Sequence, residues 1–144
     1  METILIEATA RTPKFDFDPE KRTLILSGES YPEDPQKFFA APLVTIREFL
    51  KQKHDGLVQF NFQMTYFNSS SAKVMMDLFS ALEDCATEGN DVMIEWHHAD
   101  DDDNMRELGE EFSEELANAK FKLLTFNWSN DIEQLWLENF FPKK

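Results

Sequence analysis

Three consecutive serines occupy positions 69 to 71, in the stretch "YFNSSSAKVMMDLF". They lie between a run that alternates like a strand and a run with helical spacing, so a helix is expected to begin there. An oxygen of Asn68 or Ser69 could cap that helix by accepting from an unpaired N–H of the first turn. A phosphate on one of the hydroxyls would also be stabilised there, by free N–H groups and the positive end of the helix dipole. The residues alone leave both uses open.

A second group with chemical potential is His97 and His98 followed by the acidic run Asp100 to Asp103. An EF-hand loop needs alternating ligands with a central glycine, and this run has no such glycine. Zinc sites favour histidines four apart on a helix or paired cysteines, whereas adjacent histidines on a strand point to opposite sides. We therefore predict no metal and no cofactor here. The aspartates are expected to cap the following helix.

Other signs of catalysis are weak. The sequence has no nucleophile elbow, no P-loop and no glycine-rich dinucleotide fingerprint. Its single cysteine, Cys85, cannot form an intramolecular disulfide and falls at helical spacing among apolar residues, which indicates a small buried side chain. We predict a protein that is not an enzyme.

The composition limits the partners. The chain has 144 residues, 42% of them hydrophobic, which suits one domain with a real core. Its formal net charge of -14 disfavours nucleic acid and anionic membranes, both of which attract Lys and Arg. No run approaches the roughly 20 apolar residues of a membrane span, and "METILIEATA" lacks the basic start of a signal peptide. A cytoplasmic location is the resulting expectation.

The first half of the chain alternates between strand and helix patterns. "TILIEAT" predicts a short edge strand, "KFDFDPEKRTLILSG" a hairpin and "GESYPEDPQ" a loop. A helix is expected from near Pro35, kinked or delayed by Pro42 and ended near Gly56. "LVQFNFQMTYF" is the clearest strand. We expect one of its sides to carry Val58, Phe60, Phe62, Met64 and Tyr66, and the other to carry polar side chains.

The second half continues the alternation. A second helix should follow the serines and bury Ala72, Met75, Met76, Phe79, Leu82 and Cys85. "VMIEW" predicts a central strand, "MRELGEEFSEELAN" a third helix and "KFKLLTFNW" a last strand. Such alternation predicts a single α/β domain with a mixed, mostly parallel sheet and packed helices.

The end of the chain has an apolar stripe of its own. In "SNDIEQLWLENFFPKK", apolar residues recur at helical spacing, namely Ile132, Leu135, Trp136 and Phe140. An exposed stripe of that size favours association. We expect residues 126–144 to form an amphipathic extension that packs on the domain of residues 1–125 or across a homodimer interface.

Three stretches together resemble a known family. "TPKFDFDPEKRTLILSGESYPED", "YFNSSSAKVMMDLF" and "VMIEWHHADDDDNMRELGEEF" are similar to the SiaC-type biofilm-regulation phosphoproteins. The resemblance covers roughly residues 5 to 125. It implies a STAS-like fold, as in anti-sigma-factor antagonists, in which a Ser or Thr at the start of a helix is phosphorylated.

The resemblance also implies a partner-switching function. A HATPase-type protein kinase would add the phosphate and a PP2C-type phosphatase would remove it. The unphosphorylated protein would bind and activate a diguanylate cyclase, raising cyclic-di-GMP. The family's phosphorylated threonine falls on Ser69, with Ser70 and Ser71 as alternatives.

The neighbouring partner-binding residues are expected to be Asn68 and Ser70, together with Glu29, Ser30 and Tyr31 of the "SGESYPE" stretch. Two rival functions are also compatible with the sequence. The first is a STAS-like module that controls a sigma factor or a sensor kinase. The second is a metal-dependent hydrolase that uses His97, His98 and the aspartates.

Overall fold

The computed structural model describes residues 1–126 of the chain. Within them, six strands and three helices follow one another along the chain. The strands are β1 (Ile4–Ile6), β2 (Lys14–Asp18), β3 (Thr23–Ser30), β4 (Val58–Phe67), β5 (Val92–Ala99) and β6 (Lys120–Phe126). The helices are α1 (Pro35–Leu50), α2 (Ser69–Thr87) and α3 (Asp103–Ser113).

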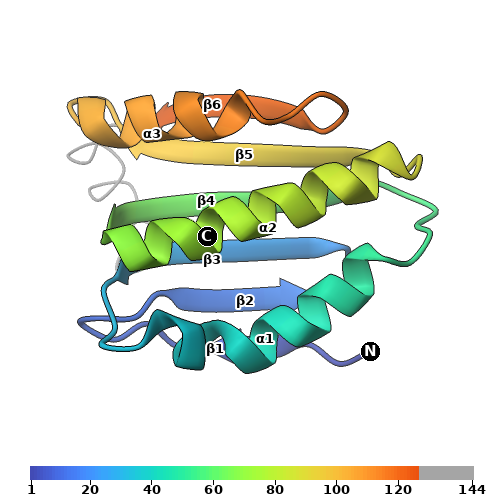
Figure 1. Ribbon diagram of the computed structural model, residues 1–144, viewed down its shortest axis with the longest axis horizontal. Coiled ribbons are helices and arrows are strands. Elements are labelled where there is room, and N and C mark those ends of the chain that lie inside the picture. Colours follow the sequence, from blue (N-terminus) through green and yellow to red (C-terminus); the bar gives the residue numbers. More distant parts are fainter. Residues whose placement is uncertain (127–144) are drawn as a thin grey trace, which may run out of the picture.

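The strands form one sheet in which the spatial order is the same as the chain order. β1, β2 and β3 pair antiparallel, whereas β3, β4, β5 and β6 pair parallel. A helix precedes each of β4, β5 and β6, and the three helices lie on one face of the sheet (Figure 1). A right-handed crossover repeated in one direction places every helix on the same side. The predicted fold class, a single mixed α/β domain, is confirmed.

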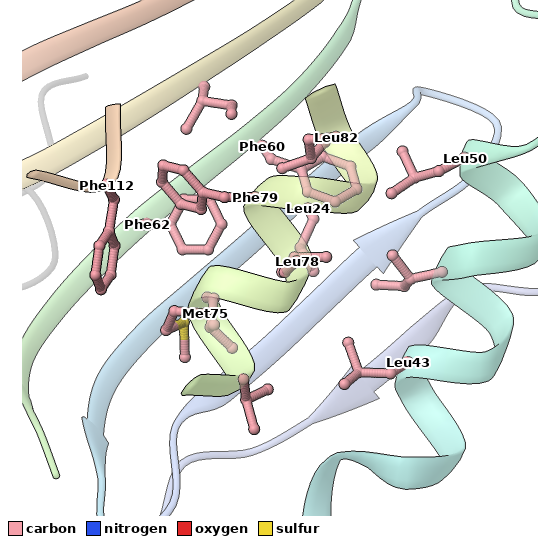
Figure 2. Close-up of a cluster of buried hydrophobic side chains, with 14 of the residues drawn as sticks. Leu24, Leu43, Leu50, Phe60, Phe62, Met75, Leu78, Phe79, Leu82 and Phe112 are labelled. Atoms are coloured by element: carbon pink, nitrogen blue, oxygen red, sulfur yellow. The ribbon is translucent and has the colours of Figure 1, made fainter. Parts of the chain in front are cut away.

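The core lies between the sheet and this helical layer. Figure 2 shows Met75, Leu78, Phe79 and Leu82 of α2 among the phenylalanines of β4. The strands contribute every second residue, as the pleat requires. On β4 these are Val58, Phe60, Phe62 and Met64, all at most 2% exposed.

An aromatic cluster joins α3 to the sheet. The indole of Trp96 lies 5.5 Å from the ring of Phe112 and 5.9 Å from that of Phe79, measured between centroids. Its Nε1–H donates to the carbonyl of Met105 at 2.9 Å. A Cβ on Gly109 would lie 2.5 Å from Cδ1 of Trp96. The absence of a side chain at Gly109 is therefore what lets α3 approach the indole so closely.

One predicted face assignment is wrong because of a β-bulge. The β3–β4 register passes from Gly28 opposite Met64 to Glu29 opposite Tyr66, so Thr65 is an extra residue on β4. An extra residue reverses the faces beyond it. Tyr66, predicted inward, is 50% exposed, and Phe67 takes the buried place at 8%.

Other differences are smaller. The stretch "GES", predicted as loop, forms the end of β3. Helix α1 begins at Pro35 as predicted but runs through Pro42 and ends at Leu50, before Gly56. On α2, Met76 is 49% exposed, while Val74 and Leu78 are buried in its place, because the stripe that faces the sheet is rotated from the predicted one.

The predicted amphipathic extension lies outside the described residues, apart from Phe126. Among residues 1–126, none of the helices is long and apolar enough to cross a membrane.

Candidate functional site

Helix α2 begins at the serines, as predicted. Asn68 is its N-cap: the side-chain Oδ1 accepts from the backbone N–H of Ser71 at 2.9 Å. The backbone of Asn68 is extended, with φ -83° and ψ 175°, which is the usual conformation of a cap. Its own N–H donates to the carbonyl of Ser30 at 3.1 Å and so fixes the start of α2 against the end of β3.

The three serines have different environments. Ser69 and Ser70, the first two residues of the helix, are exposed. Ser71 is fully buried, and its Oγ lies 2.8 Å from the Oγ of Ser30, which is also fully buried. One hydroxyl of this pair donates to the other. Ser71 is therefore a structural residue in this conformation, and Ser69 and Ser70 are the accessible hydroxyls.

The first turn of α2 contains no negatively charged side chain. The backbone N–H groups of Ser69 and Ser70 have no protein acceptor among residues 1–126, and no acidic residue lies in this turn. Helix α3 differs, since Asp102 caps it and Asp103 lies in its first turn. A helix N-terminus with free N–H groups and an uncharged cap stabilises an anion more than one whose cap already carries a negative charge.

Lys73 adds a positive charge one turn further along α2. It is exposed, and within the described part of the chain it forms no ion pair. Residues four apart on a helix lie on the same face, and an anion N-terminal to a cation is the more favourable order. A phosphate on Ser69 would therefore lie within reach of Lys73. The spacing alone could have indicated this, but sequence reasoning missed it.

The predicted contact residues of the "SGESYPE" stretch lie at the same edge of the sheet, but not all of them reach the surface. Glu29 is exposed and Tyr31 is half-buried, whereas Ser30 is 0% exposed. The bulge brings Tyr66 outward, where its ring meets that of Tyr31 edge-on at 5.8 Å. Sequence reasoning missed Tyr66. The one signal in the sequence is Gly28, whose φ of 103° lies beside the β-bulge and is a conformation that favours glycine.

The histidines and aspartates do not form a metal site in residues 1–126. His98 is buried at 3% exposure, and its Nδ1 lies 2.9 Å from the carbonyl of Ala99, whereas His97 lies on the other face of β5. Asp102 is the N-cap of α3 and accepts from the N–H of Met105 at 3.0 Å, as predicted for this run. Throughout the described range there is no group of three or more His, Cys, Asp or Glu side chains that could hold a metal.

A cavity between α1 and α2 lies away from the serines. It has about 850 Å³ and is lined by the C-terminal parts of α1 and α2, including Arg47 and Asp84, and by the residues that follow these helices, Lys51 and Glu88. Cys85 also borders it but is buried at 2%. Burial raises the pKa of the Cys85 thiol, which makes the nucleophilic thiolate scarce. None of the predicted site residues lines this cavity.

A protein family and a sequence relative match most of the chain. A family described as "SiaC family regulatory phosphoprotein" matches residues 6–126. An uncharacterised protein of Pseudomonas aeruginosa strain UCBPP-PA14 is 31% identical over 117 residues, which is 81% of this chain and 92% of that protein.

Solved structures of SiaC from Pseudomonas aeruginosa are also similar. The apo-SiaC crystal structure is 31% identical with a TM-score of 0.77, over 86% of this chain and 99% of that one. SiaC in the crystal structure of its complex with the diguanylate cyclase SiaD, which it activates, is 28% identical with a TM-score of 0.79. That match covers 85% of this chain and 99% of the other.

Proposed function

The chain belongs to the SiaC family of regulatory phosphoproteins, and we propose that it works as a partner switch with Ser69 as the phosphorylated residue. Unphosphorylated, it would bind and activate a diguanylate cyclase, as SiaC of Pseudomonas aeruginosa does with SiaD. Phosphorylation would end that binding. The protein itself would catalyse nothing.

One observation carries the choice of Ser69. It is the first residue of α2, exposed, at an N-terminus with free N–H groups and no acidic side chain in its first turn. Ser71 is unsuitable as an acceptor because a kinase would have to extract it from its buried contact with Ser30. Ser70 is also exposed and remains the alternative acceptor.

A phosphate at Ser69 would affect docking far more than folding. It adds about 1.5 to 2 negative charges at neutral pH. At a helix N-terminus that charge is favourable by roughly 0.3 to 1 kcal/mol. Buried in a protein interface without a paired cation, the same charge costs several kcal/mol. This asymmetry supports a switch that changes the partner without unfolding the domain.

The contact surface would extend from Ser69 and Ser70 to the other exposed side chains of this edge. Glu29, Tyr31 and Tyr66 lie there, and aromatic side chains are frequent energetic centres of interfaces. Ser30 and Asn68 would act from within, by holding β3 and α2 together. Ser30 is too deeply buried to contact a partner directly.

The switch needs two further enzymes. A protein kinase of the HATPase type would phosphorylate Ser69, and a PP2C-type phosphatase would reverse the reaction. All of these partners would meet the protein in the cytoplasm. Control of a sigma factor or sensor kinase instead of a cyclase is the alternative output, and a binding assay with each partner class separates the two.

The proposal is tested with Ser69→Ala and Ser69→Glu in the full chain. Ser69→Ala should keep cyclase binding and resist the kinase, whereas Ser69→Glu should bind at least tenfold more weakly with unchanged or slightly higher thermal stability. Ser80→Glu is the matched control, because Ser80 is an exposed serine further along α2. Calorimetric titration against the cyclase measures the affinities.

Phosphorylation is followed by mass spectrometry after exposure to the kinase. Phosphate found only outside residues 69 and 70 would refute the choice of site. Equal cyclase affinity of the phosphorylated and unmodified proteins would refute the switch itself.

A further inference from the structure

The sheet has a second face without a helix among the described residues. All three helices lie on the opposite face (Figure 1). We define the helix-free face by its central row of paired residues, which crosses five strands. In order from β2 to β6, the row consists of Asp16, Ile25, Asn61, Glu95 and Lys122.

This face is more enclosed than a solvated sheet surface. The side chains of Glu95 and His97 are only 19% and 24% exposed. Two polar atoms, Oδ1 of Asn61 and Nε2 of His97, are buried and have no hydrogen-bond partner among residues 1–126. The Glu95 carboxylate lies 3.4 Å from that Nε2, within ion-pair distance but without hydrogen-bond geometry. Buried polar atoms are rarely left unsatisfied, so the pattern indicates a face that receives further polar partners.

Apolar side chains share the face with these polar atoms. Ile25 belongs to the central row, and Met93 and Leu124 extend the same face on β5 and β6. All three are half-buried. A mixed surface of this kind, with an apolar part and a few polar atoms, is typical of protein contacts rather than of a solvated amide face.

The chain itself supplies a suitable segment. Residues 127–144 follow β6, whose last residue, Phe126, pairs with Ala99 at the edge of the sheet. The apolar stripe Ile132, Leu135, Trp136 and Phe140 lies in this segment. The family match ends at residue 126, and the SiaC structures are matched over 99 to 100% of their length by only 85 to 88% of this chain. The segment is therefore an addition relative to those SiaC chains.

We propose that the helix-free face is the docking surface for residues 127–144 of the same chain. The other face near β6 is already occupied by α3, through the contacts of Phe112 with Phe79 and Trp96. As a helix, residues 132–140 would span about 14 Å. That is close to three strand spacings of about 4.8 Å, so a stripe that starts over β6 would cross the central row as far as β3. On such a helix Trp136 and Asn139 lie on the stripe. The indole N–H of Trp136 suits the Oδ1 acceptor of Asn61, and the amide of Asn139, which both donates and accepts, suits Nε2 of His97 in either tautomer.

The proposal is tested by thiol labelling of the full chain. Met93→Cys places a thiol on the helix-free face, and Met76→Cys places one on the outer side of α2 as a matched control. The native Cys85 is 2% exposed and serves as the internal check of folding. Each variant is labelled with iodoacetamide with and without the double substitution Leu135→Asp and Trp136→Asp, and the sites are read by mass spectrometry.

Docking predicts that the double substitution speeds labelling at Met93→Cys at least tenfold. Labelling at Met76→Cys should change less than twofold, and Cys85 should stay slow. An unchanged rate at Met93→Cys would overturn the proposal. A protection that disappears on dilution would also overturn it, in favour of a second copy of the chain covering the face.

A second measurement does not depend on introduced thiols. Hydrogen exchange of residues 130–141 in the unaltered chain should be slowed at least tenfold relative to a free peptide. Met93→Glu should remove that protection while α2 stays protected, and Met76→Glu should not. Unprotected exchange of the segment in the unaltered chain would refute docking outright.

Discussion

The buried hydroxyl pair of Ser30 and Ser71 gives the sharpest test of how the candidate site is built. The two Oγ atoms lie 2.8 Å apart with no exposed surface on either residue. Ser71→Ala removes one hydroxyl and changes the packing volume little. The Ser30 hydroxyl then remains buried without its partner.

The expected loss follows from that unpaired group. A buried donor or acceptor left without a partner costs about 1 to 3 kcal/mol, whereas removing both members of a pair can be nearly neutral. We expect Ser71→Ala and Ser30→Ala each to lower the free energy of unfolding by about 1 to 3 kcal/mol. The double variant should lose clearly less than the sum of the two.

Chemical denaturation at neutral pH measures these differences as a double-mutant cycle. Ser69→Ala is the control, because it is exposed and Asn68, not Ser69, caps the helix. Its effect should stay within about 0.5 kcal/mol. If Ser71→Ala proved as neutral as Ser69→Ala, or if the two single losses simply added, the two hydroxyls would not form a stabilising hydrogen bond.

Two further predictions concern stability away from the serines. Desolvation raises the pKa of Glu83, but hydrogen bonds from the N–H groups of Ala119 and Asn118 outweigh it and hold the pKa below its ordinary value. A carboxyl with a lowered folded pKa stabilises the fold above its unfolded pKa and loses that effect as pH falls through its folded pKa. Glu83→Gln should therefore lower the free energy of unfolding by about 0.5 to 1 kcal/mol at pH 7, because solvent screens this partly exposed carboxylate. In denaturant titrations the difference from the unaltered chain should shrink as pH falls through the ordinary pKa of a glutamate, and a difference independent of pH would contradict this. Gly109→Ala should lower the free energy of unfolding by about 1 to 3 kcal/mol, because the added Cβ would meet Trp96 at 2.5 Å. This loss should exceed the gain of about 1 kcal/mol that alanine brings over glycine in a helix. A higher melting temperature of the variant would show that the indole can move aside.

The order of elements could be predicted from the sequence because periodicity is local. The alternation of "LVQFNFQM" and the helical spacing after Ala72 indicate a strand followed by a helix. The change of period falls between Tyr66 and Ala72, and the structure begins α2 at Ser69. An amide or hydroxyl before a helix is a cap signal, which is why Asn68 could be foreseen as a candidate.

Side-chain direction near the site could not be predicted in the same way. Tyr66 continues the alternation of β4 in the sequence, yet the extra residue Thr65 turns it outward. The bulge depends on pairing with β3, where Gly28 has a positive φ of 103°. Pairing between strands that are far apart in the chain leaves no periodic signal in either strand.

The burial of Ser30 and Ser71 was hidden for a related reason. Each serine is unremarkable in its own stretch, and their contact joins residues 41 positions apart. Burial also divides three identical neighbours into two accessible hydroxyls and one structural hydroxyl. Sequence reasoning could offer Ser69, Ser70 and Ser71 as acceptors but could not rank them by access.

The position of Ser69 explains how a single charge could act on binding without acting on the fold. The parallel strands β3, β4, β5 and β6 all end at one edge of the sheet, and the three helices begin there. Asp34 and Asp102 cap α1 and α3 with carboxylates, whereas Asn68 caps α2 with a neutral amide. At this edge, α2 is thus the helix whose positive end lacks a compensating charge in its cap and first turn.

A phosphate at Ser69 would supply that charge and give α2 the same electrostatic arrangement as its neighbours. The fold would accept it, because the cap, the Ser30–Ser71 contact and the core beneath it do not involve the Ser69 hydroxyl. The outer surface would change more, since the net charge of the chain is already -14 and nearby Glu29 is exposed. A partner that docks on this edge would therefore meet a more negative surface on a domain of unchanged shape.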